Sequence, residues 1–146
     1  MENLLDFARK RPEKARLIRF LPKGGRGAKS ARKPEKVYLE NSNLLGAILG
    51  TRHIDPSIGT VRETFFCGQM QSRFPLVAAG EADFLVDHRI TVEVGGPNKD
   101  ARQIASKSPV KRAHQSALLA VDGFEVGGGS RVPLYLFGFL EKPHAE

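Results

Sequence analysis

Two short apolar segments, residues 82–86 and 90–94, are separated by only three polar residues. A connection of this length between two segments rich in strand-forming residues is typical of a β-hairpin. The hairpin fixes two neighbouring antiparallel strands and therefore requires a sheet. Because side chains along a strand alternate between faces, we expect Asp83 and Glu93 to lie close together on one face.

The rest of the chain supplies helices and further strands for this sheet. Residues 59–71 carry apolar side chains at a spacing that predicts one buried face on a helix, with Asp55 or Ser57 as its N-cap. The order of the elements predicts a small α/β domain with a mixed sheet and flanking helices. The other expected elements are strands at 36–41 and 116–121, helices at 43–49 and 100–107, and an apolar segment at 133–140 that packs on the core.

Basic residues are concentrated in the first quarter of the chain. The formal net charge of the 146 residues is +7, and residues 1–36 hold 12 Lys and Arg against 4 Asp and Glu. We therefore divide the chain into a basic leader, residues 1–34, and a domain, residues 35–146. We expect the leader to be the remnant of an upstream segment, with a short helix over residues 2–20 that a proline interrupts.

Residues 22–34 are rich in glycine and basic residues and are bounded by prolines, which predicts a flexible loop. Its basic side chains can contact the phosphate backbone of a nucleic acid without reading the bases. The alternative is a solvated segment that links the domain to a missing upstream one. We expect deletion of residues 1–32 to leave the domain folded and to remove any affinity for DNA. The candidate nucleic-acid-binding residues are Arg26, Lys29, Arg32 and Lys33.

Length and composition exclude several classes of protein. The chain has no apolar stretch of the roughly 18–20 residues that a membrane helix needs, and its charged N-terminus does not resemble a secretory signal. We therefore expect a cytoplasmic protein without a membrane partner. A single cysteine, Cys67, excludes an internal disulfide and a cysteine-based zinc site. Residues 24–30 have the composition of a P-loop without its spacing, so we expect no ATP site in this chain.

Three acidic residues stand at positions suited to a metal site. Glu63 lies on the predicted helix, and Asp83 and Glu93 lie on the two strands of the hairpin. Carboxylate oxygens bind Mg²⁺, which can activate water against a phosphodiester. Each acid also has a structural interpretation. Asp83 can satisfy backbone groups where the strand begins, Glu63 can be a solvated helix residue, and Glu93 can pair with Arg62 or Lys99.

Five stretches of the chain carry a resemblance to known proteins: residues 33–49, 59–70, 82–86, 90–104 and 118–140. Together and in order, they resemble the C-terminal domain of a family of prokaryotic AAA+-type ATPases. In that family the ATPase module comes first, and a domain similar to the PD-(D/E)XK nuclease fold closes the chain. The resemblance covers residues 33–140 and lacks the ATPase module. It implies a restriction-endonuclease-like fold and a separate ATPase subunit as a partner.

The resemblance also implies roles for individual residues. In PD-(D/E)XK nucleases Glu63, Asp83 and Glu93 would be the metal ligands, and a lysine would follow two residues after Glu93. That position is Gly95 here, which removes a catalytic group. Lys99 follows four residues later and can reach back only if the intervening loop folds toward the acids.

The missing lysine favours a degenerate nuclease-like module that recognises nucleic acid or a partner without catalysis. One alternative is a metal-dependent DNA nuclease in which Lys99 replaces the missing lysine, with Asp83 and Glu93 beside it. The position of the Lys99 amine relative to these carboxylates distinguishes the two. The other alternative is a protein-interaction domain that docks a separate ATPase through an exposed apolar surface formed by Tyr135, Leu136 and Phe137.

Overall fold

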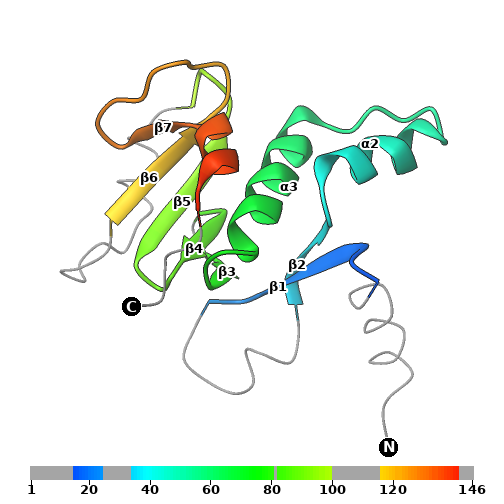
Figure 1. The fold of residues 1–146 in the computed structure, drawn as a ribbon, viewed down its shortest axis with the longest axis horizontal. Helices are drawn as coiled ribbons and strands as arrows, with labels where there is room; N and C mark the ends of the chain where they lie inside the picture. Colours follow the sequence, from blue (N-terminus) through cyan, green and yellow to red (C-terminus); the bar gives the residue numbers. More distant parts are fainter. Residues whose placement is uncertain (1–14, 25–33, 81, 100–115, 142–146) are drawn as a thin grey trace, which may run out of the picture.

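The computed structural model describes residues 15–24, 34–80, 82–99 and 116–141, which form two sheets, two α-helices and a 3₁₀ helix (Figure 1). The helices are α2 (Ser42–Gly50), α3 (Ile58–Gln71) and the 3₁₀ helix η2 (Leu134–Phe139). The small sheet pairs β1 (Ile18–Pro22) with β2 (Pro34–Leu39). The larger sheet contains β3 (Leu76–Ala78), β4 (Phe84–Val86), β5 (Ile90–Gly95), β6 (Ser116–Val121) and β7 (Arg131–Pro133).

The larger sheet is mixed, as predicted. Its strands follow the order β3-β4-β5-β6-β7, with antiparallel pairing among the first three and parallel pairing from β5 to β7. The predicted hairpin is β4-β5, and it pairs Phe84 with Val92. Asp87 and His88 in its connection have positive φ angles of 48° and 55°, which close the turn.

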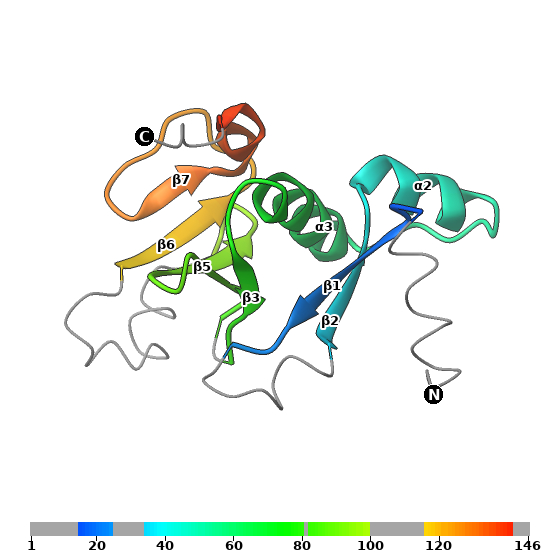
Figure 2. The same cartoon turned by 60° about the horizontal axis from the view of Figure 1, so that its bottom comes forward.

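The main core lies between the larger sheet and the two elements α3 and η2, which cover the same face of the sheet (Figure 2). The ring of Phe66 on α3 packs 4.9 Å from the ring of Phe84 on β4 and 4.9 Å from that of Phe137 on η2. Each such side chain contributes about 1.5–3 kcal/mol through its burial. A smaller apolar cluster, formed by Leu119 and Val121 with Ala117, lies on β6.

Helix α3 begins directly after its polar N-cap residue, Ser57. The side chain of Ser57 accepts a hydrogen bond from the backbone N–H of Thr60 at 3.2 Å, so Ser57 and not Asp55 is the N-cap. Within the described residues, no helix has the length and apolar character required to cross a membrane.

Strand β1 lies in the segment that we assigned to the leader, and this corrects the predicted organisation. Residues 18–20 belong to a strand, whereas we predicted a helix over 2–20. Leu21 is fully buried in the main core, and the main-chain oxygen of Phe20 accepts a hydrogen bond from Gln71 at 3.0 Å. The fold therefore starts before residue 35.

The predicted apolar surface is only partly exposed. The apolar segment at residues 133–140 does pack on the core, but Phe137 is buried and does not belong to the predicted exposed surface. Tyr135 and Leu136 are exposed. Arg26, Lys29, Arg32 and Lys33, like the helix predicted at residues 100–107, lie outside the described residues.

Candidate acidic site at the end of the hairpin

Asp83 is held at the point where the pairing of β4 with β5 stops. Its Oδ2 accepts a hydrogen bond from the backbone N–H of Val94 at 2.9 Å. The ladder ends at the pair of Phe84 with Val92, so the carboxylate takes the place of the next main-chain acceptor. One oxygen of Asp83 thus satisfies a backbone N–H group where the strand begins. The other oxygen is free to face a cation.

That cation is Lys36, which the sequence did not single out. Its Nζ lies 3.3 Å from Oδ1 of Asp83 and 3.4 Å from Oε2 of Glu63. The three residues come from β2, from the position directly before β4 and from α3, so tertiary structure alone brings them together. Their side chains are partly shielded from water, which strengthens the interaction of their charges.

Tyr38 fixes the orientation of Glu63. The hydroxyl of Tyr38 donates a hydrogen bond to Oε2 of Glu63 at 2.7 Å. Burial of the tyrosine and its hydrogen bond to Glu63 raise the pKa of the Tyr38 hydroxyl well above its ordinary value, so the group remains a donor. Lys36 and Tyr38 are two residues apart on β2, so their side chains point to the same face.

Glu93 has a different partner. Val92 and Val94 belong to the core cluster that contains α3, so strand alternation turns Glu93 toward the other face of β5. The prediction that Asp83 and Glu93 lie close together on one face is therefore wrong, because Asp83 faces Lys36 and Glu63 on the side of α3. There Oε1 of Glu93 lies 2.6 Å from Nζ of Lys99, which also donates a hydrogen bond to the main-chain oxygen of Val94 at 3.3 Å. The pair is mostly shielded, with 17 % of the Glu93 side chain and 28 % of the Lys99 side chain exposed.

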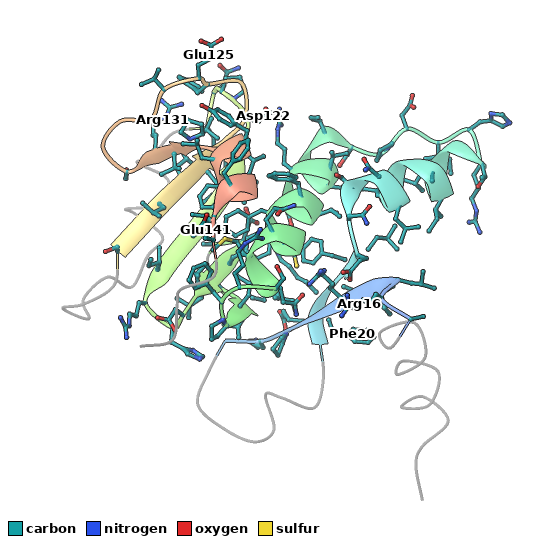
Figure 3. The ribbon with its side chains drawn as sticks, viewed as in Figure 1. Arg16, Phe20, Asp122, Glu125, Arg131 and Glu141 are labelled. Atoms are coloured by element: carbon teal, nitrogen blue, oxygen red, sulfur yellow. The ribbon has the colours of Figure 1, made fainter. Side chains whose placement is uncertain are left out.

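Gly95 leaves space for this arrangement. A Cβ atom at Gly95 would overlap the Lys99 side chain, lying only 2.9 Å from its Cβ and still closer to its Cδ. The side chain of Lys99 therefore runs across the backbone at position 95. Arg62, the other predicted partner of Glu93, instead pairs with Asp122 at 3.0 Å. Asp122 directly follows β6 (Figure 3).

The structure joins two of the three predicted metal ligands. Glu63 and Asp83 share Lys36, while Glu93 is paired with Lys99. Among the residues that the structure describes, no group of three or more His, Cys, Asp or Glu side chains is placed to hold a metal ion. Mg²⁺ is often bound by one or two carboxylates with water and substrate oxygens, so the pair of Glu63 and Asp83 fits it in donor type and number.

The sequence carried only a weak signal for Lys36 and Tyr38. Their spacing places both side chains on one face of the strand predicted at residues 36–41. Their partner Glu63 is 27 residues from Lys36 and 25 from Tyr38 in the chain, and no local pattern indicates that packing.

In comparison with known proteins, the chain matches no family model, no curated protein and no solved structure.

Proposed function

We propose that this chain is a nuclease-like module of restriction-endonuclease-like fold that hydrolyses a phosphodiester bond in nucleic acid with the help of a divalent cation. The observation that supports this proposal is the position of Lys99, whose ammonium group lies 2.6 Å from Glu93. Gly95 clears the path of the lysine side chain. Lys99 therefore supplies, from a loop, the group that the resemblance places at position 95.

The candidate site residues form two sets, one that would bind the cation and one that would act on the phosphate. Glu63 and Asp83 would hold the cation, because their oxygens already converge on the positive charge of Lys36. When bound, Mg²⁺ lowers the pKa of a water ligand and neutralises charge on the phosphate. Glu93 orients Lys99, whose ammonium group also donates to the main-chain oxygen of Val94, the residue whose N–H holds Asp83. At this edge of β5 the ammonium group would stabilise negative charge at a neighbouring phosphate oxygen.

A second candidate function is recognition without catalysis, and a different observation favours it. Each of the three acids is already paired with a lysine, and Glu93 does not join the pair of Glu63 and Asp83. In this case the acids and lysines are structural, and the module binds nucleic acid or a partner through other surfaces.

We propose a separate AAA+-type ATPase as the partner under either function. Apolar side chains of η2 and the residue after it remain exposed, with Phe139 at 77 % and Tyr135 at 48 % of their full accessibility. The rings of these two residues lie 6.5 Å apart, so they form one surface. Exposed apolar surface of this kind marks interaction sites. Leu136 and Leu140 are exposed beside them.

Cleavage of labelled single- and double-stranded DNA and RNA by the full chain tests the proposal. With Mg²⁺ or Mn²⁺ we expect cleavage that chelation abolishes. Asp83→Asn and Lys99→Met should each slow it by about a hundredfold or more. The control is Arg89→Gln, which should retain full activity. Arg89 is an exposed residue in the turn at the far end of the hairpin. Absence of cleavage in the wild type, with metal-independent nucleic-acid binding, would favour the second candidate instead.

A further inference from the structure

Lys36 occupies the position toward which two carboxylates point. Its Nζ contacts Asp83 at 3.3 Å and Glu63 at 3.4 Å, and it lies 5.5 Å from the centre of the Phe84 ring. A single ammonium group thus touches both acids that would hold a divalent cation. A metal ion and the ammonium group cannot occupy that position together, since both are cations that need the same oxygens.

The acids are fixed more firmly than the lysine. Asp83 is bound to the backbone of Val94, and Glu63 is bound to the hydroxyl of Tyr38. Lys36 has a flexible four-carbon side chain that is 32 % exposed, and its two carboxylate contacts are longer than the other bonds of this cluster. The lysine can therefore move into water while the carboxylates keep their orientation.

We propose that Lys36 is an internal counter-ion that competes with the divalent cation and so sets the metal concentration at which the site becomes active. This inference rests on the proposed function. In the metal-free chain the ammonium group offsets one of the two negative charges of Glu63 and Asp83. Binding of a divalent cation displaces it, and the affinity of the site for metal is lowered by the interactions that Lys36 loses.

The predicted consequence is a gain of metal affinity when Lys36 is removed. Titration calorimetry of Mn²⁺ into the full chain measures this without any substrate. Lys36→Met should bind Mn²⁺ about tenfold or more tightly than the wild type, because the ammonium group that competes for the oxygens of Asp83 and Glu63 is lost. Lys36→Arg keeps the charge and should show no gain. Lys36→Met combined with Asp83→Asn should lose the binding.

Control variants separate this inference from the proposed function. Arg89→Gln removes one positive charge at the far end of the hairpin and should leave the Mn²⁺ affinity unchanged. If the wild type binds Mn²⁺ through Asp83 but Lys36→Met binds within twofold of it, the counter-ion role is wrong and the metal site stands. If neither the wild type nor Lys36→Met binds Mn²⁺, both proposals are wrong. Circular dichroism of each variant verifies that the chain is folded.

Discussion

Gly95 and Lys99 depend on each other at the level of single atoms. A side chain at Gly95 would collide with Lys99, and Lys99 in turn needs the open backbone to reach Glu93. Moving the lysine from position 99 to position 95 therefore tests whether its charge beside Glu93 is what matters. A lysine at 95 would stand two residues after Glu93, on the same face of β5, where strand alternation directs it to the same carboxylate.

We predict that Lys99→Ala reduces phosphodiester cleavage by about a hundredfold or more and that addition of Gly95→Lys restores most of it. Gly95→Lys alone should lose activity, because the new side chain displaces Lys99. The measurement is the cleavage rate at saturating Mg²⁺. A double variant as inactive as Lys99→Ala would show that the function of Lys99 depends on its loop and not on its charge beside Glu93.

Cys67 gives a prediction about alkaline pH. Burial raises the pKa of its thiol from the ordinary 9.0 to about 12. The unfolded chain releases this proton near pH 9 and the folded chain does not, so the folded state binds more protons above that pH. The free energy of unfolding should therefore be unaffected below pH 9 and fall as the pH rises toward 12, by at most about 1.4 kcal/mol per pH unit.

Urea unfolding between about pH 8 and about pH 10 measures this slope. Cys67→Ala should be less stable than the wild type but should show a shallower slope, since the group that titrates is gone. A thiol reagent should react with Cys67 only after unfolding, because the side chain has no exposed surface. Rapid labelling of the folded wild type would contradict the burial on which the prediction depends.

Residue patterns predicted the acids better than their partners. Glu63, Asp83 and Glu93 stand on the predicted helix and hairpin, and the pairing of Glu93 with Lys99 was one of the alternatives considered. Lys36 could not be predicted to lie between Glu63 and Asp83, because it is 47 residues away from Asp83 in the chain. Contacts of that kind follow from the packing of β2 against α3, which sequence periodicity does not encode.

At the scale of elements, β1 extends the folded domain into residues that we had assigned to the leader. It pairs along its length with β2, and its residue Leu21 is fully buried. We now predict that deletion of residues 1–32 unfolds the chain, in contrast to the expectation from charge distribution. The deletion would leave the main-chain edge of β2, the strand that carries Lys36 and Tyr38, without its pairing partner.

Leu21→Ala tests the same point by substitution. Loss of a fully buried leucine should lower the free energy of unfolding by about 2–4 kcal/mol. Leu17→Ala, one residue before β1, is the matched control, because its side chain is 48 % exposed and the change should cost less than about 0.5 kcal/mol. Urea denaturation measures both values. Equal effects of the two substitutions would mean that β1 does not pack on the core.

The strength of the periodic signal decided which elements were predictable. The helix α3 and the hairpin have long or paired patterns, and both were predicted close to their observed bounds. β3 and β7 have only three residues each and show no alternation that could be recognised. β1 follows a segment with helical spacing and many basic residues, so composition outweighed the strand signal of residues 18–22.

At the scale of the whole molecule, the mixed α/β class was predictable because a hairpin, an amphipathic helix and a later apolar strand leave few other architectures. The site arises where these elements meet. α3 contributes Glu63 on the face that carries the main core, and β5 contributes Glu93 on the opposite face. Asp83 lies at the edge between them, bonded to β5 and facing Lys36. Replacement of Asp83 should therefore disturb both the pair with Glu63 and the end of β5.

Because folding creates the pair of Glu63 and Asp83, a cation that binds there should stabilise the whole chain. We predict that Mn²⁺ at about 100 times its dissociation constant raises the free energy of unfolding of the wild type by about 2.7 kcal/mol and the melting temperature by several degrees. Asp83→Asn should melt at a lower temperature without metal, and Mn²⁺ should not raise it. Glu93→Gln should keep most of the rise, since Glu93 lies outside the pair. An equal rise in Asp83→Asn would place the bound metal elsewhere in the molecule, and loss of the rise in Glu93→Gln would mean that all three acids share one cation.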